Sequence, residues 1–418
     1  MKRRDFLATS AQLGLAGTVL PVIGRAATAP CPVPTVSVSG GTSASTPCVA
    51  ETPGSAPQWF LDMKDSTWAT PVKNTLDSVK PSGDFGNHAA ICTAWTGGCA
   101  DQSRGELILA ANGGHGDYSG NEVYACAMRA SSPVWARLTN PSVDSGGAEG
   151  KQTAASYGDG KPRTVHGWNR CVFGNGRVWY AGMDGMYPSG NWSTAVYSFN
   201  RSSLTWTYHG LGISSINQSS FSWQGGPAAY DRVGNKVWSI AQYATGQGGI
   251  SVDASTGART EYDWYFPDNR GGDWMVVAHN TSPRVLIHSV HNTGQLYILN
   301  LENVGAGWTK KTPGGSPSGM ADGTGAVYHA PSRAILSWKD CGSQIRKLAI
   351  PSDPINGAYT WSAINAASGN AVTPPAGPSQ GTFGKFNIIE DMGNGRSALV
   401  LVTSTTGPVY VYKLPASV

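Results

Sequence analysis

The chain has 418 residues, a formal net charge of +4 and only 13% charged residues. Its hydrophobic fraction of 40% is sufficient for a large core and excludes an intrinsically disordered chain. Outside the N-terminus no apolar run is long enough to cross a membrane. The 54 glycines and 15 tryptophans favour a turn-rich all-β protein over a helical one.

The first 29 residues have the features of an export signal. Lys2, Arg3 and Arg4 form a basic start, an apolar stretch follows, and small residues precede the expected cleavage site. RRDFL resembles a twin-arginine signal, so residues 1–29 predict export of a folded bacterial chain to the periplasm or beyond. An ordinary secretory signal with a chance arginine pair is the alternative.

The expected mature chain is almost neutral. Residues 1–29 carry four basic residues and one acidic residue, so cleavage lowers the net charge from +4 to +1. Proteins that bind nucleic acid need clustered positive charge, so we expect no nucleic-acid partner. We also expect no membrane association after cleavage, and a monomer.

Residues 30–55 are rich in Pro, Ser and Thr and predict an extended arm, while residues 56–418 predict a single domain. Export permits disulfides. The natural local pairs are Cys31–Cys48 and Cys92–Cys99, Cys126 and Cys171 could join neighbouring elements, and Cys341 would remain. The sequence leaves the pairing of the cysteines undetermined. A zinc site is the rival interpretation, but the sequence has no CxxC or HxxxH motif.

From about residue 86 one unit repeats about six times. Each unit has a short apolar strand, a Gly/Asn/Asp turn, a second strand, a loop, a third strand and often a Trp-bearing strand. The first strands are expected near residues 89, 170, 228, 275, 326 and 386, the earliest of them at Ala89–Ala94. A period of about 50 residues with four strands is typical of kelch-type propeller blades. A β-sandwich or several small β domains are the alternative.

The sixth unit ends without a Trp-bearing strand, and an isolated segment with Trp68, Asp65–Pro71, stands before the first unit. An N-terminal strand in the last blade would close the ring and remove an open sheet edge. The sequence therefore predicts an all-β, kelch-like β-propeller with six or seven four-stranded blades, closed by an N-terminal strand. A seventh blade would be built partly from Gln58–Pro81.

In such a ring the loops before first strands and those between second and third strands open on one face. Imidazole and phenol groups can transfer protons, arginine can hold a carboxylate with two hydrogen bonds, and aromatic rings offer flat faces to sugars. The candidate catalytic residues on this face are His115, His88, His166 and Tyr118. The candidate substrate-binding residues are Arg163, Arg170, Asn169, Trp168, Tyr187 and Arg270.

Each candidate also has a structural interpretation. Kelch-type blades carry a Gly-Gly pair after the second strand for turn geometry alone, as at Gly113–Gly114. Buried histidines and arginines often only bond loop carbonyls. His288 and His291 alternate on one strand and could share a metal, but no third ligand is evident.

The Gly-Gly-His-Gly-Asp-Tyr loop, set among repeated blades, is similar to exported bacterial kelch-like propeller proteins. His88 followed by His115 also resembles propeller polysaccharide lyases, namely the ulvan lyases and the lyase that releases rhamnose from glucuronate. The resemblance covers residues 60–415, but its specific part is these few positions. The two histidines are 27 residues apart, with an insertion between them. The family tyrosine is Tyr118 or Tyr187, and the family's metal-binding residues do not map.

The resemblance implies β-elimination in a uronate-containing polysaccharide or oligosaccharide. His115 would abstract the C5 proton, His88, His166 or a tyrosine would protonate the leaving oxygen, and arginine or asparagine would stabilise the enolate-like transition state. No cofactor is required, and the metal content is left open.

Other functions are open on the same residues. A non-enzymatic carbohydrate- or protein-binding propeller is the main alternative and would show aromatic platforms without convergent bases. A hydrolase needs two facing carboxylates, and no motif selects a pair. A copper oxidase of the galactose-oxidase kind needs a tyrosine crosslinked to a cysteine, and no cysteine clearly belongs to this face.

Overall fold

The computed structural model describes residues 55–114, 117–142, 155–188, 190–211, 226–240, 248–264, 274–290, 293–316, 323–338, 340 and 342–418. The predicted signal peptide and almost all of the predicted arm lie outside the described residues. So do His115, Arg270, His291, Cys31, Cys48 and Cys341.

The described strands form six sheets, which we call blades I to VI and write from the inner to the outer strand. Blade I contains β2 (Cys99–Asp101), β3 (Glu106–Ala110), β4 (Val123–Ala127) and β5 (Trp135–Arg137); blade II contains β6 (Val172–Gly174), β7 (Arg177–Met186), β8 (Asn191–Asn200) and β9 (Thr205–Leu211). Blade III contains β10 (Ala228–Asp231), β11 (Lys236–Ile240), β12 (Gly249–Asp253) and β13 (Arg259–Tyr262).

The second half of the chain repeats this order. Blade IV contains β14 (Met275–Ala278), β15 (Val285–Ser289), β16 (Leu296–Asn300) and β17 (Trp308–Lys311). Blade V contains β19 (Gly325–His329), β20 (Ala334–Trp338), β21 (Ile345–Ala349) and β22 (Thr360–Ile364), with β18 (Gly314–Gly315) added in parallel to β22. Blade VI contains β23 (Phe386–Ile389), β24 (Ala398–Val402), β25 (Val409–Lys413) and β1 (Trp68–Ala69).

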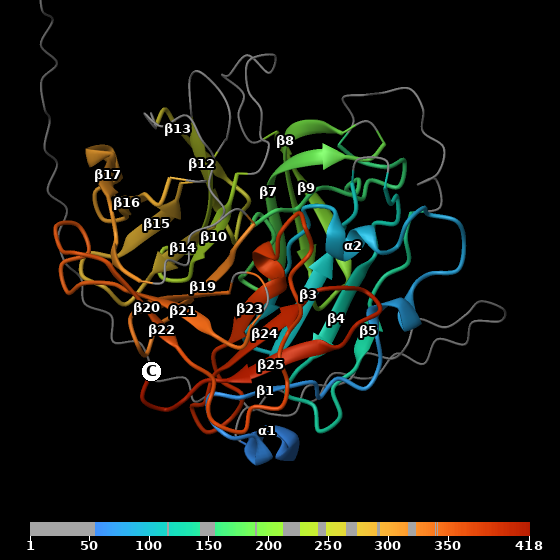
Figure 1. The fold of residues 1–418 in the computed structure, drawn as a ribbon. Coiled ribbons are helices and arrows are strands. Elements are labelled where there is room, and N and C mark those ends of the chain that lie inside the picture. The colour runs from blue at the N-terminus through green and yellow to red at the C-terminus, as the bar shows by residue number, and fades with distance from the viewer. Residues whose placement is uncertain are drawn as a thin grey trace, which may run out of the picture. The chain divides into compact units, whose positions relative to one another are not determined.

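The inner strands close a ring. β2 contacts β6, and the contacts continue through β10, β14 and β19 to β23, which contacts β2 again (Figure 1). The fold is therefore a β-propeller, as predicted, and it has six blades in the described residues. The segment 58–81 does not build a seventh blade: it forms helix α1 (Gln58–Asp62), strand β1 and the short helix η1 (Leu76–Val79).

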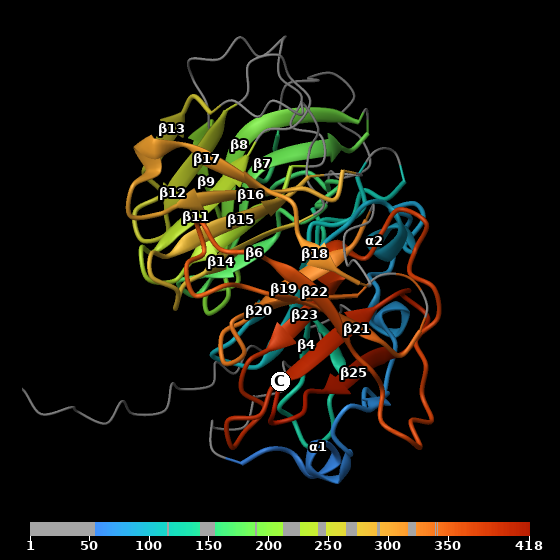
Figure 2. The same ribbon diagram turned by 60° about the vertical axis from the view of Figure 1, so that its left-hand side comes forward.

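An N-terminal strand completes the last blade, as the position of the isolated tryptophan predicts. Trp68 pairs with Tyr412 and Ala69 with Val411, and the rings of Trp68 and Tyr412 lie 5.1 Å apart. In both views the blue segment with α1 lies close to the red end of the chain (Figure 1, Figure 2).

The first strand of blade I is not where the sequence predicts it. Ala89–Ala94 belongs to a short helix, α2 (Ala90–Thr93), and the inner strand starts at Cys99. Alanine favours helix, and the Thr93 hydroxyl donates to the Ala89 carbonyl one turn earlier. The other five inner strands begin within two residues of the predicted positions.

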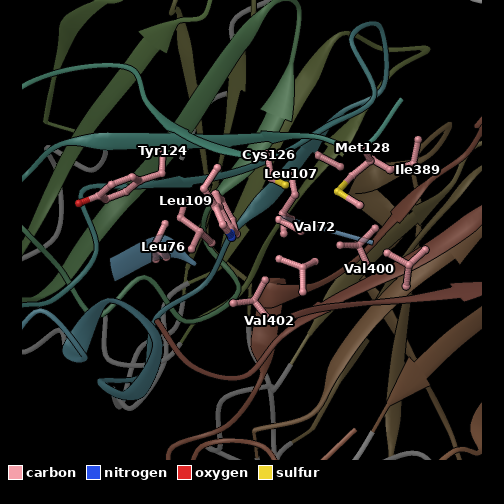
Figure 3. Close-up of a cluster of buried hydrophobic side chains, with 14 of the residues drawn as sticks. Val72, Leu76, Leu107, Leu109, Tyr124, Cys126, Met128, Ile389, Val400 and Val402 are labelled. Atoms are coloured by element: carbon pink, nitrogen blue, oxygen red, sulfur yellow. The ribbon is translucent and has the colours of Figure 1, made fainter. Parts of the chain in front are cut away.

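Six apolar clusters fill the spaces between neighbouring blades. Figure 3 shows the cluster between blades I and VI, where Leu107 and Leu109 of β3 face Val400 and Val402 of β24. Val72, from the segment after β1, packs into the same cluster, so the N-terminal segment contributes to this core as well as to the sheet. None of the helices in the described part of the chain is long and apolar enough to span a membrane.

The four described cysteines, Cys92, Cys99, Cys126 and Cys171, form no disulfide, so the suggested local pair Cys92–Cys99 is absent. Cys92 lies in α2 and Cys99 in β2, and the sulfur of Cys99 approaches Cys171 instead, at 3.5 Å.

Candidate functional site

Three aromatic side chains meet where the chain enters the inner strands of blades I, II and VI. Trp95 precedes β2, Trp168 precedes β6, and Phe383 begins the short helix η3 (Phe383–Lys385) before β23. The ring centroids of Trp95 and Trp168 are 5.9 Å apart, and those of Trp168 and Phe383 are 5.2 Å apart. We call these three residues the aromatic cluster. Both tryptophans are half-buried, so the cluster has an accessible side.

All three members have left-handed backbone conformations, with φ of 50° for Trp95, 43° for Trp168 and 43° for Phe383. Bulky residues rarely adopt this region, and each instance costs on the order of 1–3 kcal/mol. The backbone of Trp168 is held by its N–H, which donates to the Trp95 carbonyl at 2.7 Å. Strain of this kind gathers at functional sites, so its threefold occurrence marks this part of the ring.

Two glycines let the three loops approach. A Cβ on Gly97 would collide with the Trp168 carbonyl, and a Cβ on Gly384 would collide with the Gly98 carbonyl. The close contact of the loops therefore depends on glycine at both positions.

Polar groups hold the Trp168 side chain in place. Its indole Nε1 donates to Asp184 Oδ2 at 2.7 Å, and Asp184 is buried in β7. The His166 backbone N–H donates to the Asp184 carbonyl at 2.9 Å, and the His166 ring lies 5.0 Å from that of Trp95. One carboxylate and one imidazole thus accompany the aromatic cluster.

A buried lysine supports the loop that carries Trp95. Lys385 is fully buried, and its Nζ donates to the Thr96 carbonyl and lies 3.4 Å from the Thr96 hydroxyl oxygen. Burial lowers the pKa of Lys385 to about 8, while the nearby Cys92 thiol acts in the opposite direction. Burial of Cys92 itself raises the pKa of its thiol to about 12.

His88 and Tyr118 belong to a separate buried chain of hydrogen bonds. His88 Nδ1 lies 3.0 Å from Asp77 Oδ1, and Nε2 lies 3.1 Å from the Tyr124 hydroxyl. The hydroxyls of Tyr124 and Tyr118 lie 2.7 and 2.6 Å from the same oxygen of Glu122. We call these five residues the tyrosine–histidine network.

Burial sets the charges in this network. It lowers the pKa of His88 against the opposing effect of Asp77, and it raises the pKa of Glu122. Both shifts favour neutral groups. The Tyr124 and Tyr118 hydroxyls both donate to Glu122 Oε1, and the two ring nitrogens of His88 face Asp77 Oδ1 and the Tyr124 hydroxyl oxygen. The network therefore links His88 to Glu122 through the Tyr124 hydroxyl by an unbroken chain of hydrogen bonds.

The predicted substrate ligands lie around the same loops. Arg163 donates to the Tyr187 carbonyl at 3.0 Å, and its guanidinium carbon lies 5.3 Å above the Tyr157 ring. Arg170 is 1% exposed and donates to the Gly226 carbonyl at 2.5 Å, and burial lowers its pKa to about 10. These side chains bond loop carbonyls in the structure.

The structure therefore brings Trp168 and His166 together at the aromatic cluster. It places His88 and Tyr118 in the tyrosine–histidine network instead. Gly114, which precedes His115 in the chain, lies against the His166 segment: a Cβ on Gly114 would be 2.8 Å from the His166 backbone nitrogen. Sequence reasoning missed Trp95 and Phe383. The available signal was an aromatic residue one or two positions from glycine, just before an inner strand.

A cavity of about 440 Å³ lies among the six inner strands, and both polar and apolar residues line it. Of the predicted site residues in the described part, only Asn169 lines it; Cys99 and Cys171 line it too. No group of three or more His, Cys, Asp or Glu in the described residues could hold a metal ion.

No protein-family model and no curated protein matches the chain. Among solved structures the chain is similar to the Malassezia sympodialis allergen Mala s 1, with 11% identity, a TM-score of 0.45, and 79% of this chain and 96% of that chain covered. It is also similar to an auxiliary nutrient binding protein from Bacteroides ovatus, with 10% identity, a TM-score of 0.47, and coverage of 84% and 77%. A virginiamycin B lyase from Staphylococcus aureus matches with 10% identity, a TM-score of 0.41, and coverage of 83% and 100%.

Proposed function

We propose that this protein is a carbohydrate-binding propeller that holds a sugar ring against Trp95 and Trp168. The observation that carries the proposal is the pair of half-buried indoles, 5.9 Å apart, kept in left-handed backbone conformations. The flat faces of indole rings suit the C–H faces of a pyranose, and the structure already bears the cost of ordering them.

The surrounding groups support a polar ligand. His166 lies beside Trp95, and Asp184 fixes the Trp168 indole with a hydrogen bond of 2.7 Å. A sugar hydroxyl can accept from or donate to an imidazole, which gives orientation to the apolar stacking.

Binding is favoured over catalysis because the other predicted groups have internal partners. Both ring nitrogens of His88 face partners inside the fold, and Arg163 and Arg170 each donate to a loop carbonyl. A lyase would need an arginine or a similar donor directed at the substrate carboxylate.

Isothermal titration calorimetry with neutral and uronate-containing oligosaccharides tests the proposal. At least one member of the panel should bind the wild type, and Trp95→Ala or Trp168→Ala should weaken that binding at least tenfold, or about 1.4 kcal/mol. The matched control is Trp308→Ala in blade IV, a half-buried tryptophan on an outer strand. Equal losses in all three variants, or no binding by the folded wild type, would overturn the proposal.

A polysaccharide lyase of the β-elimination type is the second candidate, because the loop that leads to His115 passes His166. Gly114, directly before His115 in the sequence, lies against the His166 backbone, where a Cβ would be 2.8 Å from the backbone nitrogen. The test is ultraviolet absorbance of the unsaturated product during incubation with uronate polysaccharides. Product that disappears in both His166→Ala and His115→Ala would favour the lyase over the binding protein.

We also propose export, which the twin-arginine pattern of residues 1–29 supports. Replacing Arg3 and Arg4 by lysine should keep the full-length chain in the cytoplasmic fraction of a bacterial host. Normal processing of that variant would indicate an ordinary secretory signal.

A further inference from the structure

The cysteines Cys99 and Cys171 sit at the junction of blades I and II. Cys99 begins β2 and Cys171 directly precedes β6, and these inner strands contact each other. Both side chains are buried, and their sulfurs lie 3.5 Å apart although 72 residues separate them in the chain. A disulfide requires about 2.0 Å between sulfurs, so a small side-chain movement suffices.

Both cysteines also follow the aromatic cluster closely. Trp95 lies four residues before Cys99, and Trp168 lies three residues before Cys171. A bond between the two sulfurs would tie together the two segments that carry the half-buried indoles.

We propose that Cys99 and Cys171 form an interblade disulfide under oxidising conditions and that this bond fastens the Trp95 and Trp168 loops to each other. Formation of the bond does not depend on the proposed carbohydrate binding; its effect on the ligand does. In the structure the two cysteines are not bonded to each other.

The chemistry is thiol–disulfide exchange with a small disulfide such as oxidised glutathione. One protein thiolate attacks the oxidant and releases a first thiol; the second protein thiolate then attacks the mixed disulfide and releases the other. The two protein thiols lose two protons and two electrons, and the oxidant becomes two thiols. Both cysteines line the central cavity of about 440 Å³, and their side chains belong to the apolar cluster between blades I and II.

The pair lies in tightly packed surroundings that would keep the bond in place. Neighbouring Gly98 has no room for a side chain, since its Cβ would lie 2.7 Å from Leu109, and the Asn112 amide donates to the Gly97 carbonyl at 2.7 Å. The segment 97–99 is therefore fixed on blade I before any bond forms. A disulfide between Cys99 and Cys171 would close a long loop and strongly restrict the unfolded chain. Oxidation should therefore stabilise the fold.

Peptide mapping of the full chain tests the bond. The protein is folded, treated with oxidised glutathione or with dithiothreitol, alkylated in denaturant and digested with trypsin. Cleavage after Arg170 and Arg177 releases a peptide with Cys171 alone, whereas Cys92 and Cys99 share one peptide because no lysine or arginine lies between them. Cys92→Ser is therefore the matched control for Cys99→Ser.

The expected result is a linked pair of these two peptides in the oxidised wild type and in Cys92→Ser, and none in Cys99→Ser or Cys171→Ser. The melting temperature of the wild type should rise by roughly 5 °C on oxidation, with no such rise in Cys99→Ser. Absence of the linked peptides, both after oxidation of the folded protein and after refolding with the oxidant, would overturn the proposal.

The role at the site is measured separately, by comparing oligosaccharide affinity in the oxidised and reduced wild type. We expect oxidation to tighten binding severalfold, because pre-ordered loops lose less freedom on binding. A linked pair with unchanged affinity would overturn the fastening role. A linked pair in a protein that binds no sugar in either state would overturn the proposed function and leave the disulfide standing.

Discussion

Arg232, which lines the central cavity, forms an ion pair with Glu390. Arg232 follows β10 of blade III and Glu390 follows β23 of blade VI, two blades that stand opposite each other in the ring of six. Nη1 of Arg232 lies 3.0 Å from Oε2 of Glu390, and Nη2 approaches the other carboxylate oxygen. A second bidentate pair, Arg201 with Glu106, joins neighbouring blades II and I at 2.8 and 2.9 Å.

The two pairs should differ in their contribution to stability because their exposure differs. Arg232 and Glu390 are 45% and 24% exposed, whereas Arg201 and Glu106 are 5% and 2% exposed. We expect Glu390→Gln to lower the free energy of unfolding by less than about 1 kcal/mol. Glu106→Gln should lower it by about 3 kcal/mol or more, because it leaves a buried guanidinium without its countercharge. Urea denaturation measures both, and equal losses would contradict the argument.

The second prediction concerns the contribution of the N-terminal strand β1 to stability. A chain that begins at residue 55 retains β1 and should unfold like the full mature chain. A chain that begins at residue 72 lacks the Trp68–Tyr412 and Ala69–Val411 pairing and exposes the edge of β25. We expect it to be several kcal/mol less stable and to associate through that edge. Light scattering and thermal melting of the two truncated chains test this, and equal behaviour would mean that β1 does not close the ring.

Sequence reasoning could predict this fold because each blade carries its own local signals. Turns such as Asn175–Gly176 separate apolar runs of strand length, and a tryptophan marks five of the six outer strands, from Trp135 in β5 to Trp68 in β1. The exception among the inner strands, Ala89–Ala94, fails because alanine-rich segments of this length satisfy both helix and strand patterns. Only the pairing of Cys99 with Ile108 decides where blade I begins.

The candidate site was less accessible to prediction. Trp168 and His166 could be selected because their residue types suit a sugar site. Trp95 could not, because its importance depends on a backbone φ of 50° and on contact with Trp168, which is distant in the chain. Likewise, nothing in the sequence indicates that His88 reaches Asp77 and Tyr124, which only the folded loops bring to it.

A glycine beside His166 gives a third prediction. Gly185 has φ of 55°, and a Cβ there would collide with the His166 imidazole. Gly185→Ala should therefore displace His166 and weaken oligosaccharide binding at least tenfold. Gly176→Ala is the matched control, since its φ is 72° and its Cβ would meet nothing within 4 Å. Both variants bear a backbone cost of about 1 kcal/mol, so only a difference in ligand affinity supports the role of His166.

The tyrosine–histidine network predicts two opposing effects of pH on stability. The pKa of His88 is lowered below 6.5 in the fold, so the unfolded chain binds the proton more readily and stability falls as pH drops through that range. The pKa of Glu122 is raised above 4.5, so the folded chain holds its proton more readily and stability falls as pH rises from 4.5 through the raised pKa.

Urea unfolding from about pH 4 to pH 8 separates these effects. His88→Gln should remove part of the loss of stability that occurs as the pH falls below 6.5. Glu122→Gln should remove part of the loss of stability that occurs as the pH rises above 4.5. Glu302→Gln, at a carboxylate that is 53% exposed, is the control and should leave the profile unchanged. Parallel profiles for the wild type and both network variants would show that neither group changes its protonation on folding.

The last prediction concerns Lys385 and the stability of the fold at alkaline pH. Its pKa falls from 10.5 to about 8 because the folded chain buries it completely. Between these two values the unfolded chain binds the proton more strongly, so the contribution of Lys385 to stability rises with pH from about 8 to about 10.5 and is constant below that window.

Lys385→Met has no charge to bury and should lack this rise. The difference in unfolding free energy between variant and wild type should therefore move in favour of the wild type by about 3 kcal/mol across the window, because a tenfold change in proton affinity corresponds to about 1.4 kcal/mol. Lys64→Met, at an exposed lysine, is the control and should show a constant difference. A constant difference for Lys385→Met as well would mean that Lys385 keeps its proton in the fold, and that the hydrogen bonds to Thr96 offset the cost of burying its charge.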